Sequence, residues 1–217
     1  MKKSVVSFIC FVLSVLSTQP LAAEIKDEKF GFELKLPGEL KEYPEGVKLY
    51  EGLEGVDLDK ILYFFILGDP EDDQIDIHFM IEAMGGLIGR EDLSKYAEGV
   101  EGMTIFKEKW RSFEINVFRI HEKFGDIETL TFNAQVPLKP EAIQLKLIGE
   151  KSREDELLSI LRSALNNLSG ETNWLTKEER RKKFLNGGIP LAITILIVWI
   201  TIRIVTVKRR MRRSSSS

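Results

Sequence analysis

Residues 142–168 read AIQLKLIGEKSREDELLSILRSALNNL, a strand pattern that passes directly into a helix pattern. Over Ala142–Ile148 apolar side chains alternate with polar ones, as in a strand with one buried face. From Ser152 to Leu168 the apolar residues recur every three or four positions, which gives a helix one broad apolar face. Ser152 and Asp155 resemble a capping box at the start of this helix. We therefore expect the helix to pack as a lid on a sheet that contains the strand.

Further strand patterns lie upstream and are joined by turn residues. Gly125-Asp126 supplies a two-residue turn typical of a hairpin. Residues 39–59 have no clean period and predict a loop with a short helical turn, whereas Leu93, Tyr96, Ala97 and Val100 recur at helical spacing. The strands are predicted at 30–36, 61–67, 75–82, 104–110, 114–124 and 127–136.

The order of these elements indicates an α+β fold, an antiparallel sheet with packed helices. With its opening FGFELKLP at residues 30–37 and its closing strand and helix at 142–168, the chain resembles the PsbP-like sandwich family. The resemblance covers roughly residues 29–168 and rests on the order of elements, not on a diagnostic motif. It implies a small exported or organellar accessory module of a kind that generally lacks catalytic residues.

Both ends of the chain carry membrane signals. Residues 1–23 predict a signal peptide, with Lys2 and Lys3 before an apolar core and cleavage after Ala22 or Ala23. An uncleaved N-terminal anchor is the alternative, and it leaves the following domain on the same side of the membrane. Residues 189–207 are almost wholly apolar and, as a helix, span ~28 Å, close to the thickness of a bilayer core. Arg203 lies near the inner end, where its side chain reaches the headgroups.

The predicted organisation follows from these signals. An exported domain occupies residues 24–170, a charged juxtamembrane stalk 171–188, a single transmembrane helix 189–207 and a basic cytoplasmic tail 208–217. The domain is expected outside the cytosol, in the periplasm or the extracellular space. We interpret the stalk as a solvated spacer that can form a helix. Contact between its basic residues and anionic lipid is the less favoured alternative.

Charge and cysteine content exclude several classes of function. All 34 acidic residues fall between Glu24 and Gly187, where the net charge is −11 against −3 for the whole chain. Nucleic acid is therefore excluded as a partner, since its phosphates are bound by Lys and Arg. Acidity serves solubility, with a basic partner or a cation as the minority interpretation. Cys10 lies in the predicted signal, so the mature chain has no disulfide, thiol nucleophile or cysteine-ligated metal.

The histidines and acidic residues do not form a recognisable site. His78 is expected on the polar face of its strand, and His121 on a face shared with Arg119 and Lys123; both are interpreted as solvated strand residues. The glycines at 85, 86 and 89 lack a P-loop lysine and predict a flexible connector. A run of acidic residues predicts a soluble hairpin tip, with a weak cation site as the alternative: Asp69, Glu71, Asp72, Asp73 and Asp76.

Aromatic and aliphatic residues of the central strands are interpreted as core and not as a ligand box: Trp110, Phe118, Ile120, Phe124, Leu130 and Phe132. No catalytic, cofactor-binding or metal-binding residue is predicted, and no cofactor. The expected function is a membrane-anchored, non-catalytic binding or accessory module with an envelope protein as partner. Two alternatives stay open: a carboxylate-based envelope enzyme, and a subunit of a membrane complex assembled through its anchor helix.

Overall fold

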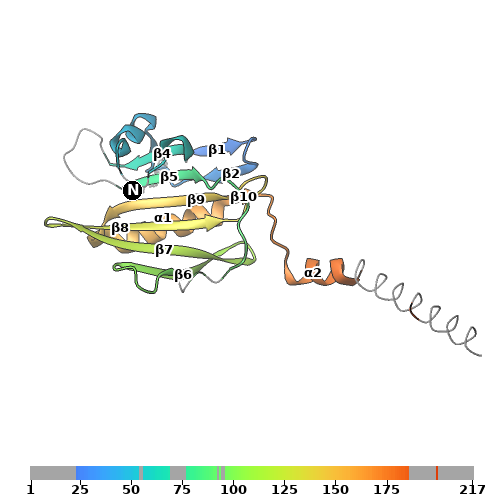
Figure 1. Cartoon of the computed structure of the whole chain (residues 1–217). Helices are drawn as coiled ribbons and strands as arrows, with labels where there is room; N and C mark the ends of the chain where they lie inside the picture. Colours follow the sequence, from blue (N-terminus) through green and yellow to red (C-terminus); the bar gives the residue numbers. More distant parts are fainter. Residues whose placement is uncertain are drawn as a thin grey trace, which may run out of the picture. The chain divides into compact units, whose positions relative to one another are not determined.

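Seven antiparallel strands form the main sheet of the protein, with neighbours in the order β3-β4-β5-β9-β8-β7-β6 (Figure 1). The structure is a computed structural model, and it describes residues 23–53, 56–68, 77–91, 93, 96–185 and 199. Most of the predicted strands are confirmed. Their bounds are β3 Lys41–Glu42, β4 Ile61–Leu67, β5 Ile77–Ala83, β6 Met103–Trp110, β7 Phe113–Phe124, β8 Ile127–Val136 and β9 Ile143–Glu150.

One face of this sheet is covered by the helix α1, Glu154–Asn167, as the sequence predicts (Figure 1). The helix buries its apolar stripe against β9, whose alternate residues Ile143, Leu145 and Leu147 are fully buried. Gly149 lets the helix approach the sheet, because a Cβ there would lie 3.1 Å from Leu157. The buried stripe of α1 consists of Leu157, Ile160, Leu161, Ala164 and Leu165.

Two ion pairs link α1 to strands of the main sheet. Arg119 on β7 donates two hydrogen bonds to Glu154, with Nε–Oε1 at 2.7 Å and Nη2–Oε2 at 3.0 Å. This hydrogen bonding lowers the pKa of the Glu154 carboxyl. Arg162, two turns further along, pairs with Glu108 on β6 at 2.6 Å. The ion pairs therefore link the helix to β6 and β7, in addition to its packing on β9.

A second, three-stranded sheet has the order β1-β2-β10. It consists of β1 Glu24–Asp27, β2 Phe32–Lys35 and β10 Leu168–Gly170. The strand β10 begins where α1 ends, and Leu168 pairs with the fully buried Leu34 of β2. The indole nitrogen of Trp110 donates to the Leu168 carbonyl at 3.0 Å, which ties this small sheet to β6.

The α+β class is confirmed, but the prediction of more than one packed helix is wrong. Around residues 93–100 the described backbone forms turns, and Tyr96 and Val100 are 67% and 49% exposed. Without an apolar surface beneath it, the helical spacing there has nothing to stabilise it. The predicted capping box is wrong as well. Ser152 lies in the 3-10 turn η4, Lys151–Arg153, and α1 begins at Glu154 with no side-chain cap.

The core prediction for the central strands is partly correct. Trp110, Leu130 and Phe132 are fully buried. Phe118 and Ile120 are half-buried, because the register of β7 places them on the face away from α1. The side chain of Phe124 lies outside what the structure describes.

The chain divides into a unit that ends at Glu171 and a second that begins at Thr172. In the second unit, the predicted stalk contains the helix α2, Lys177–Lys183. Thr176 and Glu179 cap it reciprocally, at 3.2 and 2.7 Å. In the described part of the chain no helix has the length and apolar character needed to cross a membrane. The predicted signal before residue 23, the acidic tip at 69–76, the tail and the run 189–207, apart from Trp199, lie outside the described residues.

Replacing Leu161 with Asp should severely destabilise the domain. Leu161 is a fully buried residue of α1, so the substitution places an unpaired carboxylate in the core at a cost of several kcal/mol. That is a large share of the ~5–15 kcal/mol expected for a domain of this size. Ser159→Asp, on the exposed side of the same helix, should change stability by less than about 1 kcal/mol. Thermal unfolding of residues 24–170 measures both. Equal melting of Leu161→Asp and wild type would show that α1 does not cover the sheet.

Candidate functional site

The face of the main sheet opposite α1 carries a band of polar side chains, most of them buried or half-buried, here called the polar face. Strand register defines it, because residues paired across antiparallel strands point to the same side. Glu82 pairs with Gln144, and Asn133 pairs with Lys146. The polar face consists of His78 and Glu82 on β5, Gln144 and Lys146 on β9, Thr131 and Asn133 on β8, Asn116 on β7 and Lys107 on β6.

Glu82 is the centre of the hydrogen bonding on this face. Its carboxylate accepts from Gln144 Nε2 at 3.1 Å and from Lys146 Nζ at 3.4 Å. The side chains of Glu82 and Lys146 are each only 17% exposed. An ion pair this sheltered from solvent holds its two partners in a defined position. The pair therefore gives the middle of the polar face a fixed arrangement of one carboxylate, one ammonium and one amide.

At the β4 end, the polar face is bordered by an aromatic cluster. Tyr50 belongs to the 3-10 segment η1, Pro44–Tyr50, and packs on Phe64 of β4 with ring centroids 5.9 Å apart. Its hydroxyl shares a hydrogen bond of 2.6 Å with His78 Nδ1. Burial, followed by the negative charge of Glu82, raises the pKa of Tyr50. The interpretation of His78 as a solvated residue is therefore wrong: it lies against Tyr50 and Phe64 and links the cluster to the polar face.

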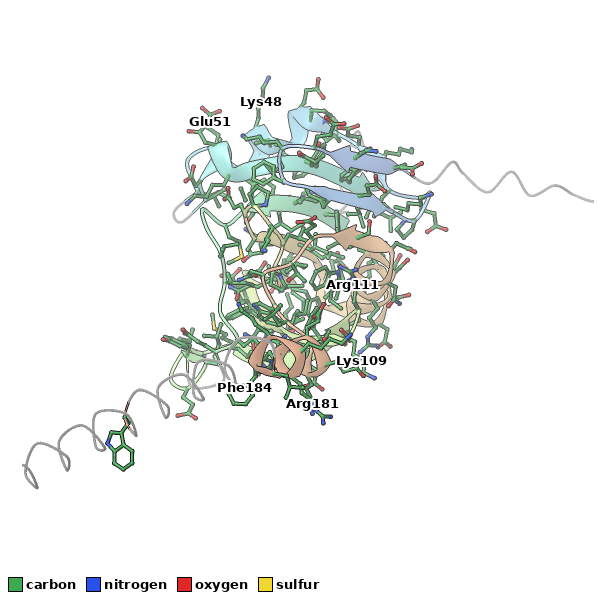
Figure 2. All side chains as sticks on the ribbon, turned by 90° about the vertical axis from the view of Figure 1, so that its right-hand side faces the viewer. Lys48, Glu51, Lys109, Arg111, Arg181 and Phe184 are labelled. Carbon is green, nitrogen blue, oxygen red and sulfur yellow. The ribbon has the colours of Figure 1, made fainter. Side chains whose placement is uncertain are left out.

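At the β6 end, the chain between β5 and β6 borders the polar face. Figure 2 shows this segment running along the side of the sheet away from α1. The Asn116 amide donates to the Glu91 carbonyl at 3.3 Å and accepts a hydrogen bond from the Lys107 ammonium. Near the centre, Asn133 Oδ1 is buried and accepts no hydrogen bond from any residue that the structure describes. An acceptor left in this state costs about 1–3 kcal/mol.

The two bordering segments expose large apolar side chains. Leu49 lies within the 3-10 segment that carries Tyr50 and Leu53 follows it, in the region where Figure 2 labels Lys48 and Glu51. Leu87, Tyr96 and Val100 lie in the segment between β5 and β6 and are 49–67% exposed. The polar face is thus bordered on two sides by exposed apolar groups.

The other features weighed in the sequence lie elsewhere. His121 is on the α1 side of the sheet, paired with Leu130, and its Nε2 lies 3.2 Å from Glu128 Oε2. Glu128 also accepts from Lys151 at 2.6 Å, and this hydrogen bond lowers the pKa of Glu128. His121 thus has Glu128 as a hydrogen-bond partner, and the two histidines lie on opposite faces. Among the described residues no three His, Cys, Asp or Glu side chains converge as metal ligands.

Two open hollows accompany these features. One, of about 530 Å³, lies beside Glu128 and Lys151 at the β7–β8 turn. The other, of about 360 Å³, lies between β1, β2 and β10 and is lined by Phe32, Ser169 and Gly170 among others. At the glycine connector, the amide of Gly85 donates to the Glu141 carboxylate, so this amide is bound by an anion within the chain itself. The flexibility predicted for 85–89 stays a prediction.

Sequence reasoning did not identify Tyr50, Glu82, Gln144 or Lys146 as a group. Alternation places Glu82 and Lys146 on the polar sides of their own strands. That β5 lies next to β9, more than 60 residues away, is a consequence of topology that no spacing in the sequence encodes.

No protein-family model matches the chain, and no curated protein matches it. A solved structure from Bacteroides thetaiotaomicron is similar, with TM-score 0.44 and 8% identity, over 70% of this chain and 50% of that one. The chain thus spans about half the length of that protein. LpqN of Mycobacterium tuberculosis, described as involved in cell envelope biogenesis, is similar with TM-score 0.42 and 10% identity, over 68% of this chain and 88% of LpqN. Neither likeness is close enough to bear on the function of this chain.

Removing the Tyr50 hydroxyl should destabilise the domain in a pH-dependent way. Tyr50→Phe loses the hydrogen bond to His78, at a cost of about 1 kcal/mol near neutral pH. Because the folded pKa is raised, the contribution of the hydroxyl is complete below the ordinary value of 10.0 and declines as the pH rises above it. The difference in unfolding free energy between wild type and variant should therefore shrink towards about pH 11.

Urea denaturation at neutral and alkaline pH tests this expectation. Tyr96→Phe, at a position 67% exposed, is the matched control and should leave the unfolding free energy unchanged. A Tyr50→Phe difference that stays constant over the whole pH range would contradict the buried Tyr50–His78 contact.

Proposed function

We propose that the chain is a membrane-anchored, non-catalytic binding or accessory module displayed outside the cytosol, and that the polar face is its binding surface. The observation that carries the proposal is the combination of fixed, half-buried polar groups at the centre of this face with exposed apolar side chains on its two borders. Binding surfaces combine these two features: apolar groups supply affinity and a few positioned polar groups supply specificity.

The polar groups favour recognition because they are already ordered. Glu82, Gln144 and Lys146 hold one another, so a partner does not have to pay for fixing their rotamers. The Glu82 carboxylate, which is 17% exposed, is an acceptor that a partner's N–H or O–H group can reach. These features support a partner that carries hydrogen-bond donors.

The dimensions favour a protein over a small molecule. Tyr50 packs on β4 and Glu91 contacts β7, which are separated by β5, β9 and β8. Four spacings of about 4.8 Å place the two bordering segments about 19 Å apart. A partner that touches both segments at once must span this width. The domain is strongly acidic, which favours a partner surface that carries basic groups.

Photo-crosslinking in intact cells tests the binding surface. A crosslinking amino acid is placed singly at Leu53, Tyr96 or Ile127 of the full-length chain, all of them exposed positions. We expect Leu53 and Tyr96 to give adducts of the same protein, identified by mass spectrometry, and Ile127, in the distant β7–β8 hairpin, to give none. Adducts that are equally strong at all three positions, or that form at Ile127 alone, would refute the polar face as the interface.

The location outside the cytosol rests on the two terminal signals. An export signal at residues 1–23 and an anchor at 189–207 would leave residues 24–188 outside and the basic tail inside. The mature chain has no cysteine, so a single introduced thiol reports on one position. A membrane-impermeant maleimide should label Ser112→Cys, in an exposed turn, in intact spheroplasts. Ser215→Cys should be labelled only after lysis. The reverse pattern would overturn the topology.

A further inference from the structure

The helix α2 has two faces of different charge. At 3.6 residues per turn, Lys177, Arg180, Arg181 and Phe184 follow the i, i+3, i+4, i+7 spacing and share one side. Figure 2 shows Arg181 and Phe184 on the same side of the helix. The other side holds Glu178, Glu179, Lys182 and Lys183, in which each glutamate stands four residues before a lysine. One side therefore carries three cations with an apolar ring, and the other carries no net charge.

Phe184 is held in this arrangement by the helix itself. Its backbone is helical, with φ −65° and ψ −45°, and its N–H bonds to the carbonyls of Arg180 and Arg181. The Phe184 side chain is 66% exposed and that of the next residue, Leu185, is 45% exposed. The sequence thus presents apolar groups directly after four consecutive basic residues.

Burial does not stabilise α2 in the described part of the chain. None of its seven residues is buried, and the helical backbone continues through Phe184 and Leu185. Short isolated helices are marginal in water even for helix-favouring sequences. The capping box of Thr176 and Glu179 fixes where the helix begins, and a surface that accepts its basic, apolar side would stabilise the rest.

We propose that the side of α2 formed by Lys177, Arg180, Arg181 and Phe184 lies on the membrane surface and binds anionic lipid headgroups. This inference rests on the proposed anchor at 189–207. Four residues separate Phe184 from Ile189, and the five residue-to-residue steps between them reach only about 18 Å even when the chain is fully extended. With Ile189 at the bilayer surface, α2 has to lie close to the headgroups, where Phe184 enters the interface and the three cations meet lipid phosphates.

The domain and α2 carry net charges of opposite sign. Residues 24–176 hold 32 acidic and 18 basic residues, a net charge of −14, whereas α2 has a net charge of +3. An anionic membrane therefore repels the domain and attracts α2. The charges therefore favour contact of α2, and not of the domain surface, with an anionic membrane.

The test uses the full-length chain in lipid nanodiscs, either of neutral phosphatidylcholine or of a mixture with phosphatidylglycerol. Hydrogen exchange of the α2 amides is measured by mass spectrometry. Two variants remove the same charge: Arg180→Gln with Arg181→Gln on the proposed lipid side, and Lys182→Gln with Lys183→Gln on the opposite side. Each basic residue near an anionic surface contributes about fivefold in binding.

We expect phosphatidylglycerol to slow exchange in the wild type and in the Lys182/Lys183 variant. In the Arg180/Arg181 variant the exchange should be faster than in the wild type by at least about fivefold. Loss of protection to the same extent in both variants would refute the assigned side. Protection that depends on Arg180 and Arg181 but not on phosphatidylglycerol would indicate an acidic protein surface and refute the lipid proposal. Failure of the chain to insert into the discs would instead refute the anchor.

Discussion

The burial of α1 against β9 and its neighbours is the interaction on which the rest of the structure depends. Leu157, Leu161 and Leu165 are buried almost completely, and each such side chain contributes about 1.5–3 kcal/mol. The same helix delivers Leu168 to β10, which completes the small sheet beside Leu34. Loss of this packing would therefore expose one face of the main sheet and, at the same time, disrupt the small sheet that contains β10.

This packing also explains why the other face of the main sheet is different. An antiparallel sheet needs only one face in the core, so the opposite face is free to carry polar residues. Here that face is partly covered from two sides by loop segments, and the result is an ion pair, Glu82–Lys146, with little exposure to water. We propose that α1 provides stability, that the polar face binds the partner, and that the basic charge of α2 favours its contact with an anionic membrane.

The sequence predicts the local elements of this fold well and their assembly poorly. A continuous apolar run locates β4 and alternation locates β9, while the apolar period of α1 identifies its buried stripe, because alternation and the helical period are both created by burial on one side. The same period around Tyr96 predicts a helix that does not form, since periodicity does not reveal whether a surface lies beneath it. His78 shows the corresponding limit for the site. Its strand face is predictable, but its contact with Tyr50 depends on a loop 28 residues earlier.

The central claim, that one sheet face is sealed by α1 while the other is occupied by a partner, is tested most directly by hydroxyl-radical footprinting. The full-length chain is oxidised in its native membranes and again after purification in mild detergent. The account predicts that Leu53, Leu87 and Tyr96 react more slowly in the native membranes, while Ile127 reacts equally in both. Equal reactivity of Tyr96 and Leu53 in both preparations would contradict it, because the apolar borders of the polar face would then be uncovered in the cell.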